Sequence, residues 1–142
     1  MSVTVIRDQS LPMRQIVHVG KHLISADGSE EEGGSGAGPS PHDLYDAALS
    51  ACKALTVVWY AKHKGIPLGP VEVTTERDAS DERKGTYRLA VTLHLGGDLS
   101  AEQREQLLAA AHKCPIHKLM TSVTTEVTTT LAPVLAPGVA ST

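Results

Sequence analysis

The most regular hydrophobic pattern in the chain lies in residues 40–65, and it predicts one long helix. Polar side chains recur there at helical spacing and form a single stripe, made of Asp43, Asp46, Ser50 and Lys53. Nearly all other positions are apolar, so a helix of roughly 36 Å must be buried on most of its sides. Ser40 and Pro41 suit its first turn, and Gly65 suits its end.

Alternation of apolar and polar residues predicts strands in the rest of the chain. Residues 3–5 and 15–24 predict a hairpin near the N-terminus. Two half-buried strands are expected at 70–76 and 87–95, and a last strand is expected at 121–131.

A second helix is indicated by a capping box, in which Ser100 is followed three residues later by Gln103. We expect it to end before Cys114-Pro115, with a short helical turn continuing to Met120. Strands therefore cluster around two helices instead of alternating with them, which favours an α+β fold with antiparallel sheets.

The domain organisation follows from these elements. The Gly- and Ser-rich segment 25–40 reads as a loop, and no Lys-Ser/Thr pair supports a phosphate-binding loop there. We expect one domain over residues 1–132 and a frayed tail over 133–142. Because one chain of 142 residues has little material to cover the long helix, we predict a homodimer with these helices at its centre.

Composition and charge exclude some classes of function. The net charge is −3 and aromatic residues make up only 3%, so the chain offers neither a cationic surface nor stacking platforms for nucleic acid. The N-terminus lacks the apolar run of a secretory signal, and the apolar stretch 45–61 is interrupted by polar residues. We therefore expect a cytoplasmic protein that does not insert into membranes.

The two cysteines are the residues most suited to chemistry. Cys52 and Cys114 are 62 positions apart, so any disulfide depends on the fold bringing them together. Local sequence favours Cys114 as the acidic thiol, since it precedes a new helical turn and has His112, Lys113 and His117 nearby. By the same reasoning Cys52, within an apolar helix, needs a cation from elsewhere to become reactive.

Other interpretations of the cysteines stay open at this point. Both can be unrelated buried thiols. Zinc could be held by Cys52, Cys114 and His117 with His42 or His112, although only one close ligand pair supports it. A hydrolase is disfavoured because no nucleophile-elbow pattern surrounds Cys52.

Two segments together resemble the family of osmotically inducible protein C and the organic hydroperoxide resistance proteins (OsmC/Ohr). They are GPSPHDLYDAALSACKALTVVWYAKHKG, at 38–65, and KCPIHKLMTSVTTEV, at 113–127. The similarity extends from about Gln15 to Leu131. Its most specific feature is the joint presence of a cysteine deep in the central helix and a later Cys-Pro.

The resemblance implies a thiol peroxidase that reduces organic hydroperoxides or hydrogen peroxide and is built as an intertwined homodimer. It implies that Cys52 is the peroxidatic and Cys114 the resolving cysteine, which reverses the preference drawn from local sequence. Oxidation would pass through a Cys52 sulfenic acid to a Cys52–Cys114 disulfide. A dithiol reductant of lipoyl or thioredoxin type would reset the enzyme, and no cofactor is implied.

The resemblance also concerns the activating cation. In better studied members an arginine from the N-terminal hairpin, paired with a glutamate ten residues before the first cysteine, supplies it. Here Arg14 is the best candidate for that arginine, with Arg7 as the second, and His42 stands at the glutamate position. The alternatives are a relative without peroxidase activity that binds a small lipophilic molecule in the dimer groove, and a zinc-holding or purely structural dimer.

Overall fold

The computed structural model describes residues 1–135 of the chain. Its elements in chain order are β1 (Val3–Arg7), β2 (Gln15–Val19), β3 (His22–Ala26), the short 3-10 helix η1 (Glu30–Glu32), α1 (Pro41–Lys64), β4 (Leu68–Asp78), the 3-10 helix η2 (Glu82–Lys84), β5 (Arg88–Gly97), α2 (Ala101–His112) and α3 (Pro115–Thr121). These elements form two compact units. One consists of Met1–Leu44 with residues 127–135, and the other of Tyr45–Glu126.

The first unit contains a three-stranded antiparallel sheet in the order β1-β2-β3. The sequence led us to expect one extended piece over residues 15–24, but the chain turns back on itself between β2 and β3. Gly20 adopts a φ of 59° at this turn, and Val19 pairs with His22 across it. The residue without a side chain thus converts the expected hairpin into a meander of three strands.

The Gly- and Ser-rich segment after β3 is a folded loop organised by one carboxylate. Asp27 is buried and accepts hydrogen bonds from the backbone N–H groups of Gly28, Ser35 and Ala37 at 2.8, 3.1 and 3.0 Å. The bond from Ala37, followed by the other two, lowers the pKa of Asp27 despite its burial. Gly34 must stay small, because an added Cβ would lie 2.2 Å from the carbonyl oxygen of Gly28.

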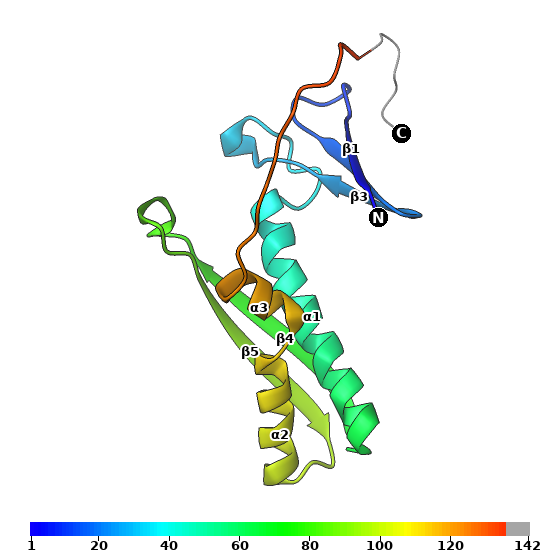
Figure 1. Ribbon diagram of the computed structural model, residues 1–142, viewed down its shortest axis with the longest axis vertical. Helices are drawn as coiled ribbons and strands as arrows, with labels where there is room; N and C mark the ends of the chain where they lie inside the picture. The colour runs from blue at the N-terminus through cyan, green and yellow to red at the C-terminus, as the bar shows by residue number, and fades with distance from the viewer. Residues whose placement is uncertain (136–142) are drawn as a thin grey trace. The chain divides into compact units, whose positions relative to one another are not determined.

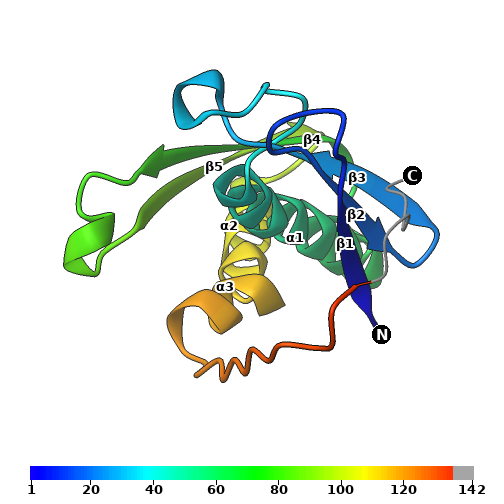
Figure 2. The same cartoon turned by 90° about the horizontal axis from the view of Figure 1, so that it is seen from above.

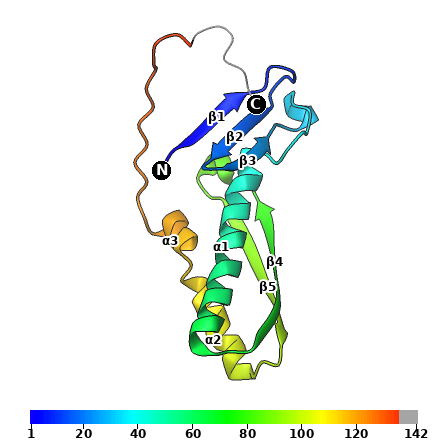
Figure 3. The ribbon, with the colours of Figure 1, turned by 90° about the vertical axis from the view of Figure 1, so that its right-hand side faces the viewer.

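The second unit is built on the long helix α1, whose predicted ends are confirmed. The Ser40 side chain accepts from the backbone N–H of Asp43 at 3.1 Å, and Gly65 ends the helix with a φ of 68°. The antiparallel hairpin of β4 and β5 covers one side of α1, and the C-terminal helices α2 and α3 follow on another (Figures 1, 2 and 3).

The core of this unit lies between the C-terminal half of α1, the β hairpin and α2. Its buried residues are Val57, Ala61, Ile66, Leu107 and Ala111. Leu93, Leu95 and Leu99 pack against them from β5 and the loop that follows. The predicted capping box opens α2, since Ser100 accepts from the backbone N–H of Gln103 and the Gln103 side chain accepts from that of Ser100.

In the polar stripe of α1, Asp46 and Ser50 are half-buried and Lys53 is buried, whereas Asp43 is exposed. Asp46 accepts hydrogen bonds from Arg77 and Tyr87, both at 2.6 Å, and Ser50 bonds Thr75 at 2.6 Å. The apolar side chains that the pattern placed on the buried sides include three that are exposed in the single chain. Leu55, Val58 and Trp59 are 70%, 48% and 61% exposed.

The contact between Tyr87 and Asp46 predicts a loss of stability in strong alkali. Burial, followed by the Asp46 carboxylate, raises the pKa of Tyr87 to about 12, against about 10 in an unfolded chain. Because the folded state binds this proton more tightly, stability is fully present below about pH 10 and falls as the pH rises toward about 12. Urea unfolding across this range checks the expectation, with Tyr87→Phe as the control, whose stability lacks this decline.

The predicted strand at 121–131 is wrong. Residues 115–121 are helical, and the described chain after Ser122 has no regular secondary structure. Val127 and Leu131 are 80% and 99% exposed. An alternating pattern alone makes no strand, because its backbone groups must pair with a neighbouring strand. None of the strands in residues 1–135 pairs with this segment.

The fold class is confirmed as α+β with two antiparallel sheets. The single domain over 1–132 stays a prediction, as does the frayed tail at 133–142, of which 136–142 lie outside the described residues. Among the helices of residues 1–135, none has the length and apolar content to span a membrane.

Candidate functional site

Cys114 occupies the junction between α2 and α3. It is the N-cap of α3, with Pro115 in the first helical position. Its Sγ accepts from the backbone N–H of His117 at 3.3 Å, and the residue is 0% exposed. The sequence correctly predicted a sulfur at a helix N-terminus, but not how deeply it is buried.

The fold brings Cys52 to Cys114 across the 62 residues that separate them. The Cys52 side chain lies close enough to the Cys114 thiol to influence its pKa, and both cysteines are free. Burial, followed by contact with Cys52, raises the pKa of Cys114 above its ordinary value, while the N–H of His117 and the charge of Lys53 act in the opposite direction. The prediction from local sequence that Cys114 is the acidic thiol is therefore wrong, because burial raises its pKa by more than the helix N-terminus lowers it.

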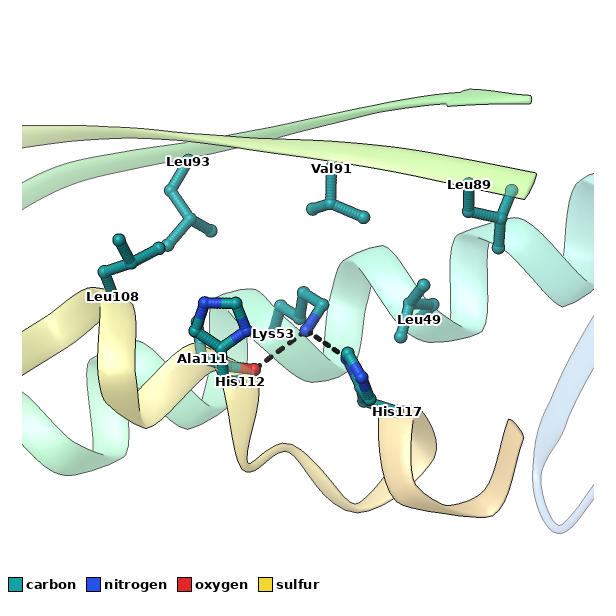
Figure 4. A pocket seen from close by; sticks show the side chains of 9 residues that line it. All are labelled: Leu49, Lys53, Leu89, Val91, Leu93, Leu108, Ala111, His112 and His117. Carbon is teal, nitrogen blue, oxygen red and sulfur yellow. Dashed lines mark hydrogen bonds between the residues drawn. The ribbon is translucent and has the colours of Figure 1, made fainter. Parts of the chain in front are cut away.

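Lys53 is the functional candidate that the sequence reasoning missed. It follows Cys52 directly and is only 5% exposed. Its Nζ donates to the carbonyl oxygen of Ala111 at 2.8 Å and lies 3.0 Å from Nδ1 of His117 (Figure 4). A lysine in an otherwise apolar segment, directly after a cysteine, was the available signal, but the sequence pattern placed Lys53 only in the polar stripe of the helix.

His117 is the partner of Lys53 and is held in its neutral form. Burial lowers the pKa of His117, and the positive charge of Lys53 and then that of His112 lower it further. Since a lysine ammonium can only donate, Nδ1 of His117 accepts, which leaves the proton on Nε2. The rings of His112 and His117 lie edge to face, with their centroids 6.4 Å apart and an interplanar angle of 71°.

A pocket of about 210 Å³ opens beside this pair. Its apolar wall comes from α1, β5 and α2, through Leu49, Leu89, Val91, Leu93 and Leu108. Lys53, His112 and His117 supply its polar groups, and Figure 4 shows Leu89, Val91 and Leu93 projecting from β5 toward the helices. The pocket is thus a largely apolar space with Lys53 in its lining, and neither cysteine is among its lining residues.

The predicted arginines lie in the first unit and have partners there. Arg14 donates from Nη1 to Asp8 and from Nε to Ser25, both at 2.8 Å. Hydrogen bonds from Ser10, followed by the contact with Arg14, lower the pKa of Asp8. Arg7 donates to the carbonyl oxygen of Pro12 at 3.4 Å.

The remaining predicted ligands do not form a metal cluster in the described chain. His42 is an exposed residue in the first turn of α1. Within residues 1–135, no three His, Cys, Asp or Glu side chains are placed to hold one metal ion.

Comparison with known proteins gives the chain its family. The family model for OsmC-like protein matches residues 33–129. A solved structure of an organic hydroperoxide resistance protein OsmC from Legionella pneumophila is 23% identical, with a TM-score of 0.63, and covers 85% of this chain and 88% of its own. OhrB of Bacillus subtilis, an organic hydroperoxide resistance protein, is 24% identical, with a TM-score of 0.56, and covers 85% of this chain and 90% of its own.

An OsmC-like protein from Mycoplasma pneumoniae is 17% identical, with a TM-score of 0.67 over 86% of this chain and 87% of its own. No curated protein matches the sequence. Because the family model spans more than half of the chain, including both cysteines, this protein belongs to the OsmC-like protein family.

Proposed function

We propose that the protein is a thiol peroxidase that reduces organic hydroperoxides or hydrogen peroxide. The observation that carries the proposal is the proximity of Cys52 and Cys114, two free cysteines 62 residues apart in sequence that the fold brings close enough to interact. Two structural neighbours are named organic hydroperoxide resistance proteins, which supports the same substrate class.

The reaction has two steps. The Cys52 thiolate attacks the distal peroxide oxygen, the O–O bond breaks, and the product alcohol or water takes up a proton. Cys52 is then a sulfenic acid, which the Cys114 thiol attacks to form a disulfide with release of water. A dithiol of lipoyl or thioredoxin type returns both cysteines to thiols.

The pocket beside Lys53, the residue that follows Cys52, suits an apolar hydroperoxide. The wall of leucine and valine side chains can receive an alkyl group, while developing negative charge on oxygen requires a nearby cation. Arg14 as the thiolate-activating residue and His42 at the family's glutamate position remain part of the proposal.

The proposal includes a homodimer in which the α1 helices meet. Leu55, Val58 and Trp59 form an exposed apolar surface on α1, here called the α1 patch. Such a patch on a long helix is typical of a protein interface. We place the active protein in the cytoplasm, where dithiol reductants keep free cysteines reduced.

Titration of the reduced protein with cumene hydroperoxide tests the function. We expect consumption of one hydroperoxide per chain without added reductant and, by mass spectrometry, one Cys52–Cys114 disulfide per chain. Adding lipoyl or thioredoxin-type dithiols should give continuous turnover. Unchanged thiols after exposure to excess peroxide would refute the proposal, and an apolar ligand that co-purifies would then favour binding in the dimer groove.

A further inference from the structure

The side chain of Lys53 joins the two chain segments on either side of Cys114. Ala111 lies three residues before the cysteine, near the end of α2, and His117 lies three residues after it, in the first turn of α3. The Lys53 Nζ contacts both, at 2.8 and 3.0 Å. Lys53 therefore ties the turn that carries Cys114 to α1, at the residue next to Cys52.

The charged and titratable groups around Cys114 come from all three helices. Cys52 and Lys53 face it from α1, His112 lies on α2 and His117 on α3. The β5 side chains nearest this region, Leu89, Val91 and Leu93, are apolar. Among these groups, Lys53 is the cation that lowers the pKa of Cys114.

We propose that Lys53 is the positioning residue of the resolving step, holding Cys114 against Cys52 and stabilising its thiolate. The expected effect on the rate of disulfide formation rests on the proposed peroxidase function. The structural basis of the inference, a buried ammonium bonded on both sides of the resolving cysteine, is independent of that function.

The step that Lys53 assists is balanced in atoms and electrons. The Cys114 thiol gives up its proton, and the resulting thiolate attacks the sulfur of the Cys52 sulfenic acid. The S–S bond forms as the S–O bond breaks, and the hydroxyl group leaves with the proton as water. The sulfenic sulfur is reduced and the thiol sulfur is oxidised, so no further oxidant or reductant is needed.

A titration without peroxide tests the inference directly. The titration of Cys114 is followed by its thiolate absorbance in two proteins, Cys52→Ser and the double variant Cys52→Ser with Lys53→Met. We expect the midpoint pH of Cys114 to be higher by about one pH unit in the double variant. The control is Lys62→Met in the same background, because Lys62 is an exposed lysine of the same helix. An unchanged Cys114 midpoint in the Lys53→Met protein would overturn the inference, whatever the peroxidase assay shows.

A kinetic measurement separates positioning from a purely structural role. In protein with both cysteines, Lys53→Met should slow disulfide formation at pH 7 by at least about threefold, since the tenfold loss of thiolate is partly offset by its greater nucleophilicity. The rate of sulfenic acid formation at Cys52 should not change, and the sulfinic acid fraction should rise. Lys53→Arg, which keeps the charge, should restore most of the rate.

Slowing of sulfenic acid formation instead would show that Lys53 serves Cys52, and would refute the assignment. If Lys53→Met does not fold, His117→Leu replaces it, since this variant removes one anchor of Lys53 and keeps the charge. It should raise the Cys114 midpoint by a smaller amount, and no rise would refute the inference. Failure of the peroxidase proposal looks different: the wild-type protein would then leave hydroperoxide unconsumed.

Discussion

Replacing Cys52 by Ser is expected to reduce hydroperoxide consumption to the rate measured without protein. A serine hydroxyl cannot form the sulfenic acid, and no other described cysteine can take over the attack, because Cys114 is fully buried with a raised pKa. Consumption of cumene hydroperoxide, followed over time with a dithiol reductant present, provides the measurement. Circular dichroism should show an unchanged fold, since the substitution alters one atom at a half-buried position.

Cys114→Ser is the matched control for this loss. It should keep the first oxidation, so that a sulfenic acid at Cys52 reacts with dimedone, but it should lose the disulfide and accumulate sulfinic acid under excess peroxide. The two variants together distinguish the roles. If Cys114→Ser abolished the first oxidation and Cys52→Ser did not, the assignment would have to be reversed.

Introducing a charge into the α1 patch is expected to convert the protein from dimer to monomer. Leu55 is the most exposed residue of this patch, and Leu55→Glu would place a carboxylate where the proposed interface buries apolar surface. Loss of one buried leucine costs about 1.5–3 kcal/mol, and burying an unpaired charge costs more. Light scattering coupled to size-exclusion chromatography should give twice the chain mass for the wild type and a single chain mass for the variant.

The control for this experiment carries the same charge elsewhere. Ala79 is an exposed residue in the turn between β4 and β5, so Ala79→Glu should remain a dimer. A wild-type protein with the mass of one chain would contradict the dimer outright. A Leu55→Glu variant that remains dimeric would place the interface away from the α1 patch.

The agreement between sequence and structure is best where local rules decide the outcome. The capped ends of α1, the capping box of α2 and the alternation in β4 and β5 depend on neighbours a few residues apart. The failures lie where a distant partner is needed. Residues 121–131 alternate as a strand should, yet no sheet edge in the described chain pairs with them.

The candidate site shows the same division. By itself the sequence determined the long helix, the cysteine within it and the second cysteine at a helix N-terminus, because spacing and caps are local properties. Only the tertiary structure decided that the two cysteines lie close together and that Lys53 is buried. It also decided that burial raises the pKa of Cys114 by more than the helix N-terminus lowers it. Burial and electrostatic interaction depend on what packs against a side chain, and that is set by residues more than fifty positions away.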